Sequence, residues 1–282
     1  MTPDAVLPAG PLVLVTGSTG YIGGRLVPEL IAAGFRVRVM TRRPRELADR
    51  DWYDQVEIVG GDAAAPDTLA QALRGVDVAY YLIHSLGTGA GFESLDRTHA
   101  KNFASAARAC NVGRIVYLGG LYPRAQKLSP HLASRKEVGE ILLASGVPTT
   151  ALRAAVIIGS GSASFEMLRY LTERLPVMVT PRWVDTLIQP ISVRDVLRYL
   201  VGSANMPPVV SRGFDIGGPE VLTYRQMMAA YADIAGLKPR RIAALPLLTP
   251  SLSSHWVGLV TPVPNSIARP LVESLINEVV CK

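Results

Sequence analysis

The chain has 282 residues, of which 49% are hydrophobic and 18% charged, and this composition excludes a disordered protein. The formal net charge is +6, but the basic residues are scattered rather than gathered in a continuous stripe, so we expect no nucleic-acid partner. Two distant cysteines, Cys110 and Cys281, indicate neither a disulfide framework nor a metal site. The first ten residues hold two prolines and an aspartate and do not resemble a secretory signal, so we expect a cytoplasmic protein.

Strand and helix patterns alternate from residue 11 to about residue 160. This alternation predicts parallel pairing with right-handed crossovers, and therefore a Rossmann-type α/β fold with a doubly wound parallel sheet. Pro28 lies inside the first predicted helix, where it removes one backbone hydrogen bond and should produce a kink. In chain order, the pattern predicts strands over 12–16, 37–40, 56–59, 76–83, 114–118 and 149–158, and helices ending at residue 33, over 67–73 and 96–110, and ending at residue 144.

The alternation weakens after residue 160, which predicts a small C-terminal cap at the carboxyl edge of the strands. We expect residues 11–160 to form a dinucleotide-binding core, and residues 161–282 to form a cap and substrate region interleaved with that core in a single compact unit. Thr223 is the expected N-cap of one cap helix. The pattern predicts helices over 165–174, 193–201 and 223–235, and a strand over 214–216.

A glycine-rich turn follows the first predicted strand and opens the first predicted helix. Gly17 permits a tight turn, Gly20 lets the backbone approach a pyrophosphate, and Gly23 lets the helix pack closely. The free N–H groups at the start of a helix favour phosphate, so the turn predicts a dinucleotide site; the alternative is a glycine turn without a ligand. We expect cofactor contacts from Gly17, Thr19, Gly20, Tyr21, Ile22 and Gly23.

The end of the second predicted strand favours NADP(H) over NAD(H). NAD sites usually carry an acid there for the ribose 2′-hydroxyl, whereas this chain has Arg42 and Arg43 and no acid before Glu46. An arginine fork pairs well with a 2′-phosphate; the alternative is a solvated surface cluster. Asp62, after the third strand, is placed either to reach the adenine amino group or to cap the next turn.

Several segments resemble the atypical branch of the short-chain dehydrogenase/reductase superfamily. That branch includes the nitrogen-metabolite-repression regulators and the NAD(P)H-binding accessory subunit of respiratory complex I. The resemblance implies a Rossmann-type fold that holds NAD(P)H, and a structural role for Asn102 in support of the sheet. It covers about residues 11–235 and rests on TGSTGYIGG at 16–24, GGD at 60–62, GVDVAYYLIHS at 75–85, KNFASAARACNVGRIVYLGGL at 101–121, QPISVRDV at 189–196 and FDIGGPEVLTYRQM at 214–227.

The resemblance also implies three catalytic positions, and this chain departs from the family at each of them. The superfamily usually transfers hydride with a Ser, a Tyr and a Lys, the last two spaced YxxxK on the helix after the fifth strand. Here His131 falls on the tyrosine position and Arg135 on the lysine position. The serine position is Gly119 or Gly120.

Two interpretations of these replacements stay open. In the first, His131 acts as the general acid, because imidazole titrates near neutral pH, and Arg135 holds a ribose hydroxyl. In the second, the site keeps the cofactor but has lost the chemistry, and His131 is an ordinary polar residue on the surface. His84 and Ser85 end the fourth predicted strand on the nicotinamide side, where they are candidate cofactor contacts or simply a capped strand end.

The sequence therefore predicts an NADP(H)-binding, oxidoreductase-like protein whose substrate it does not identify. The alternatives are a non-catalytic redox sensor that reports through a partner, and an assembly or scaffold protein that keeps the dinucleotide for stability. No metal is expected.

An uncharged segment lies near the C-terminus, since residues 242–268 contain no Asp, Glu, Lys or Arg. Its four prolines argue against a membrane-spanning helix, although Trp256 suits a membrane interface and allows peripheral membrane contact. We expect the segment either to complete the core of the cap or to dock onto a partner, a second copy or a further domain beyond this sequence. A helix is expected over 271–280.

Overall fold

The computed structural model describes residues 10–85, 91–123, 127–244 and 260–282. Within them, seven parallel strands form one sheet in the order β11-β6-β5-β4-β1-β2-β3, so the strand order reverses between β1 and β4. The predicted doubly wound, Rossmann-type sheet is confirmed. Its strands are β1 (Leu12–Thr16), β2 (Arg36–Thr41), β3 (Glu57–Gly60), β4 (Val78–Tyr81), β5 (Arg114–Gly120), β6 (Thr149–Ala154) and β11 (Arg212–Ile216).

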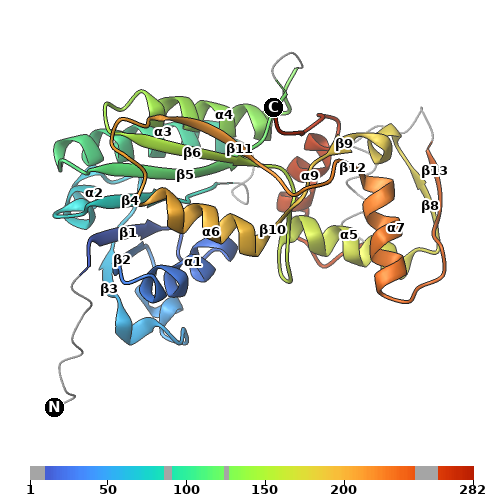
Figure 1. Cartoon of the computed structure of the whole chain (residues 1–282), viewed down its shortest axis with the longest axis horizontal. Helices are drawn as coiled ribbons and strands as arrows, with labels where there is room; N and C mark the ends of the chain where they lie inside the picture. Colours follow the sequence, from blue (N-terminus) through green and yellow to red (C-terminus); the bar gives the residue numbers. More distant parts are fainter. Residues whose placement is uncertain (1–9, 86–90, 124–126, 245–259) are drawn as a thin grey trace.

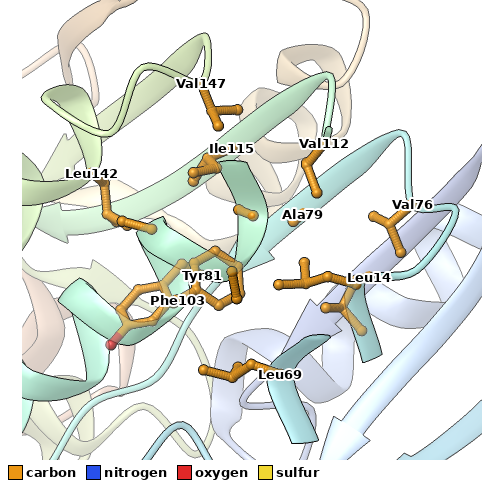
Figure 2. Packing of buried hydrophobic residues seen from close by; sticks show 14 of the residues in the cluster. Leu14, Leu69, Val76, Ala79, Tyr81, Phe103, Val112, Ile115, Leu142 and Val147 are labelled. Carbon is orange, nitrogen blue, oxygen red and sulfur yellow. The ribbon is translucent and has the colours of Figure 1, made fainter. Parts of the chain in front are cut away.

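Helices cover both faces of this sheet (Figure 1). The central strands β1 and β4 are buried along their whole length, as expected where helices cover both faces of a sheet. On one face, the rings of Tyr81 and Phe103 meet edge to face with centroids 4.9 Å apart at the centre of the packing (Figure 2). That face carries α2 (Pro66–Leu73), α3 (Phe92–Ala109) and α4 (Pro130–Leu143), and the other carries α1 (Tyr21–Ala32) and α6 (Val193–Ser203).

The first helix continues through Pro28 without interruption. Since proline has no N–H, the carbonyl of Gly24 one turn earlier loses its helical donor. The Nε1 atom of Trp52 donates to that carbonyl at 3.3 Å. A side chain from outside the helix therefore replaces the missing bond, and α1 runs on past Pro28 to Ala32.

The sixth strand is shorter than its apolar pattern suggests. The prediction of one strand over 149–158 is wrong, because β6 ends at Ala154 and the chain then leaves the sheet. The next two residues in strand conformation, β7 (Ile157–Ile158), pair with β10 (Ile191–Ser192) instead. An apolar run does not show where a chain leaves a sheet, and here the break places Ala155 on the wall of a cleft.

A smaller region with its own buried core lies beside the carboxyl ends of the strands (Figure 1, right). Thr223 caps α7 in a capping box with Gln226, which confirms the predicted N-cap. A parallel pair of strands that the sequence pattern did not predict, β8 with β13, lies at the far side of this region (Figure 1). The region contains α5 (Ala163–Arg174), β8 (Val177–Thr180), η3 (Arg182–Asp185), β9 (Leu187–Ile188), β12 (Leu222–Thr223), α7 (Tyr224–Ile234), β13 (Arg241–Ala244) and α9 (Asn265–Ser274); two further 3₁₀ turns, η1 (Pro44–Leu47) and η2 (Tyr53–Gln55), lie between β2 and β3.

The last described residues complete this smaller core. The helix predicted over 271–280 is wrong, because α9 ends at Ser274 and Val279 pairs in extended conformation with Ile188. Asn277 turns the chain: its side chain accepts from the backbone N–H of Ser129 and donates to a second backbone carbonyl. These contacts outweigh the helical pattern. The buried residues that this segment adds to the core are Val263, Ala268, Val272, Leu275 and Val279.

We expected the uncharged segment either to complete the core of the cap or to dock onto a partner. Residues 260–268, which are described, pack into the core of the cap. Trp256 lies outside the described residues. Among the described helices, none has the length and apolar character needed to cross a membrane.

Candidate functional site

The glycine turn has the conformation that its glycines were expected to permit. Gly17 has a φ of +71°, and a Cβ there would lie 2.7 Å from the carbonyl oxygen of Leu82. A Cβ on Gly23 would lie 2.3 Å from the carbonyl oxygen of Gly17, so only glycine fits where α1 meets the turn. The first turn of α1 carries no acidic side chain, which leaves its N–H groups and positive end available to an anion. This cradle fits a pyrophosphate.

A cleft of about 830 Å³ runs along the carboxyl ends of the strands, at the point where the strand order reverses. Both its position and its volume are typical of a ligand site in this kind of fold. His131 and Arg135 lie on its wall. So do all the predicted cofactor residues: Gly17, Thr19, Gly20, Tyr21, Ile22, Gly23, Arg42, Arg43, Asp62, His84 and Ser85. The structure brings them together, and their contacts with a cofactor stay predictions.

One end of the cleft is basic and exposed. Arg43 donates to Glu46 at 2.7 Å, and the two side chains are 71% and 48% exposed. Glu46 therefore offsets part of the charge of Arg43. Arg42 has no ion pair or side-chain hydrogen bond within the described part of the chain, so its guanidinium is the more available of the two.

Asp62 acts as a turn cap in this structure, which was the second of its two expected roles. Its Oδ1 atom accepts from the backbone N–H of Ala64 at 2.9 Å, although the residue also lines the cleft. Asn102 donates from Nδ2 to the carbonyl of Ala63 at 3.0 Å and so ties α3 to the same turn. This bond agrees with a structural role for Asn102.

Two histidines meet at the other end of the cleft. The Nε2 atoms of His84 and His131 lie 3.1 Å apart, and the rings stack with 13° between their planes. The Nδ1 atom of His131 lies 3.1 Å from the hydroxyl of Ser274 in α9. His131 is therefore partly buried on the cleft wall, with both ring nitrogens in contact with polar groups, and its part in any chemistry stays a prediction.

A fully buried carboxylate, Asp96, supports this histidine pair from behind. It accepts from the backbone N–H of Ser85 at 3.0 Å, from the Ser134 hydroxyl at 2.9 Å and from the Arg135 guanidinium at 2.6 Å. The Nδ1 atom of His84 lies 3.6 Å from the same carboxylate. Arg135 is only 6% exposed, so it serves first as the counter-ion of Asp96. Its expected contact with a ribose hydroxyl stays a prediction.

The surrounding protein lowers the pKa of both imidazoles. Desolvation, helped by the nearby His84 and Arg135, lowers the pKa of His131 to about 3. Desolvation also lowers the pKa of His84, although Asp96 opposes the shift. Burial alone would raise the pKa of Asp96, but the hydrogen bond from His84 and the charge of Arg135 hold it well below its usual range.

The contact between the two Nε2 atoms requires one hydrogen between them, because two unprotonated ring nitrogens would repel each other. If the Nδ1–H of His84 faces the carboxylate of Asp96, its Nε2 atom is an acceptor. For His131 to donate from Nε2 and accept at Nδ1, the single Ser274 hydroxyl proton, which is donated to the carbonyl of Pro270 at 2.8 Å, has to turn toward His131. In this neutral arrangement, Asp96, His84, His131 and Ser274 form one polar relay, with a transferable proton on His131 at the cleft wall.

The position of the family's serine is closed by packing. A Cβ on Gly119 would lie 2.7 Å from the ring of Tyr117, and one on Gly120 would lie 3.0 Å from the side chain of Leu132. The hydroxyl of Tyr117 in turn donates to the backbone carbonyl of Arg135. The end of β5 therefore has no room for a hydroxyl-bearing side chain without movement of its neighbours.

Three residues of the relay and its support, Asp96, Ser134 and Ser274, were missed by sequence reasoning. One signal did exist: Asp96 shares a face of α3 with Ala100 and Phe103, both fully buried, at helical spacing of four and seven residues. An acid on such a face needs a buried partner. Ser274 gave no signal, since it lies 143 residues from His131 in a segment without a motif.

No group of three or more His, Cys, Asp or Glu side chains suited to a metal occurs among the described residues. Both cysteines are free thiols.

A reversed parallel sheet, a glycine cradle at a helix start and a cleft across the strand ends define a dinucleotide-binding protein of the Rossmann type. The sequence profile described as NAD(P)H-binding matches residues 17–167. The chain therefore belongs to the NAD(P)H-binding family, within the atypical branch of the short-chain dehydrogenase/reductase superfamily that its sequence resembles.

Similar proteins include enzymes and an assembly factor. Ceramide reductase from Caulobacter vibrioides is 29% identical over 237 residues, which cover 82% of this chain and 73% of that protein. Photosystem II assembly factor Ycf39 from Trieres chinensis is 23% identical over 252 residues, covering 87% and 76%. The crystal structure of Citrobacter sp. triphenylmethane reductase complexed with NADP(H) shares the fold, with a TM-score of 0.73 and 18% identity over 96% of this chain and 92% of that chain.

Proposed function

We propose that this chain is an NADP(H)-dependent reductase of a carbonyl group, with His131 as the proton donor. The observation that carries the proposal is the 3.1 Å contact between Nε2 of His84 and Nε2 of His131 on the cleft wall. A purely structural role does not explain why two neutral imidazoles, with Asp96 and Ser274 beside them, face a dinucleotide cleft. Perturbed groups gathered in a cleft favour a catalytic role.

A bound nicotinamide cofactor supplies a hydride in reactions of this kind. The carbonyl carbon gains the hydride, and the carbonyl oxygen gains the proton from Nε2 of His131. As that proton leaves, the Ser274 hydroxyl turns from the carbonyl of Pro270 and gives its proton to Nδ1 of His131; the hydroxyl of Ser129 lies 2.9 Å from it and can replace the proton. A proton from solvent then restores the relay, so that one hydride and one proton convert the carbonyl to an alcohol. A neutral imidazole can act as the acid in such a step.

The proposed preference for NADP(H) rests on the basic end of the cleft. Arg42 is exposed and follows β2 directly, and no acidic residue lies between the end of β2 and Glu46. A guanidinium there suits a 2′-phosphate dianion.

A non-catalytic role is the competing function, and the replacement of the family's Ser, Tyr and Lys favours it. The two functions separate when purified protein is given NADPH and a panel of ketones, aldehydes and quinones. We expect NADPH oxidation. His131→Phe should lower kcat by roughly 10²–10⁴-fold while the dissociation constant for NADPH stays unchanged. His131→Gln, which keeps an N–H near the position of Nε2, is the matched control and should lose less.

Tight NADPH binding with no turnover across the panel would overturn the reductase proposal and support the sensor or scaffold. Full activity in His131→Phe would show that another group gives the proton.

A further inference from the structure

A second, smaller cavity lies beside the cleft at His131, within the cap. Its volume is about 120 Å³. His131, Ser164 and Leu271 belong to the walls of both cavities, so the two adjoin there. We call this cavity the apolar chamber. Its further walls come from α5, η3, α7 and α9, through residues that include Met167, Leu171, Trp183, Met228 and Leu275.

No charged side chain occurs among the described residues that line the apolar chamber. Two of its polar residues, His131 and Ser274, belong to the relay, and Ser164 lies where the chamber meets the cleft. A charged group in the chamber would lose its water and meet no opposite charge, although the walls include the hydroxyl of Tyr224 and the buried indole N–H of Trp183, which has no partner among the described residues. An apolar group would instead exchange water for contact with methionine, leucine and aromatic side chains.

From this arrangement we infer that the apolar chamber holds the apolar substituent of the substrate, a ring or chain of about six carbon atoms attached to the reacting carbonyl. An apolar cavity of about 150 Å³ accommodates benzene, and the chamber is slightly smaller. Because the chamber begins at His131, a group seated in it places the adjoining carbonyl at the proton donor. The inference rests on the proposed function, and it names the substrate class as apolar ketones or aldehydes.

A first experiment measures kcat/KM with NADPH for methyl ketones of increasing chain length. Each methylene buried in the chamber should raise kcat/KM about fourfold, until a chain of about six carbons fills it and the rise stops. Keto acids of matched length should show no rise. Val156→Phe narrows the chamber without touching the cleft wall and should end the rise at a shorter chain. Val177→Phe is the control, since Val177 is 61% exposed and lines neither cavity.

A second experiment detects binding without turnover. Methyl-labelled methionines give NMR signals at Met167 and Met228 in the chamber, at Met40 on the cleft wall and at Met206 outside both. Titration with 2-octanone should shift the signals of Met167 and Met228 and leave that of Met206 in place. NADPH alone should shift Met40.

The two readouts separate the inference from the proposed function. Shifts at Met167 and Met228 without turnover would support the chamber and overturn the reductase. Turnover that does not depend on chain length, with no shift at either methionine, would overturn the chamber and leave the reductase standing.

Discussion

The two ends of the cleft are built in different ways. One end, which we call the phosphate end, contains the glycine turn and Arg42. It comes from one continuous stretch, in which β1, the glycine turn, α1 and β2 follow one another directly. The histidine end joins the end of β4 to α3, α4 and α9, and two of its contacting side chains are 143 residues apart. The exposed arginines at the first end act almost independently, whereas the side chains at the second end contact one another around the buried Asp96. A substitution of an exposed arginine at the first end should therefore change ligand binding alone, and one at the second end should also change folding.

The largest effect is expected from Asp96→Asn. The change leaves the guanidinium of Arg135 buried without its counter-charge, and breaking a buried pair in this way costs about 3–5 kcal/mol of unfolding free energy. Urea unfolding at neutral pH measures it. Asp185→Asn removes one partner of an exposed pair with Arg225 and should cost no more than about 1 kcal/mol. Similar losses in the two variants would show that the histidine end is no more interdependent than the surface.

Arg42→Ala tests the phosphate end. It should weaken NADPH binding by about ten- to a hundredfold, because a charge-assisted contact with the 2′-phosphate is lost, and should leave NADH binding and stability unchanged. Calorimetric titration with each cofactor gives the ratio. Arg45→Ala is the matched control, since Arg45 is in the same cluster but does not line the cleft. An equal loss for both cofactors would contradict the proposed role of Arg42.

The pH dependence of stability reports on the neutral histidines. The pKa of His131 is lowered to about 3 in the folded chain, against about 6.5 when unfolded. Below pH 6.5, His131 binds a proton in the unfolded chain but not in the folded chain. The stability present above pH 6.5 is therefore lost by about 1.4 kcal/mol per pH unit as the pH falls toward 3. Unfolding free energies measured at several pH values should show a shallower slope in His131→Phe, and an unchanged slope would disprove the neutral assignment.

The smallest effect concerns α1, at the phosphate end. Trp52→Phe removes the donor that serves the carbonyl of Gly24, at a cost of about 0.5–1.5 kcal/mol. In a Pro28→Ala background the helix regains its own N–H at that position, so the same substitution should cost less. A double-mutant cycle on urea unfolding gives the coupling, and strict additivity would contradict the replacement of the helical bond by the indole.

The contrast between the two ends also explains what the sequence predicted and what it did not. The sheet, the glycine cradle and the position of Arg42 follow from local periodicity and from one motif, so they were predictable. His131 was found through its place in a family pattern, but the groups around it were not, because Ser274 contacts His131, and Asp96 contacts Ser134 and His84, only after the chain has folded. The early end of β6 at Ala154 was missed for the same reason: an apolar run has the same pattern whether it continues in a sheet or lines a cleft.

The position of Ser274 in α9 has a consequence for the order in which the protein becomes competent during synthesis. Domains acquire structure from the N-terminal side as the chain is made. The strands and turn of the phosphate end are complete within the first 41 residues, and His84 and His131 follow well before Ser274 is added. A growing chain therefore contains the residues of its nucleotide cradle long before the hydroxyl that contacts His131. If His131 gives the proton as proposed, the last described helix supplies the final contact of the proton donor.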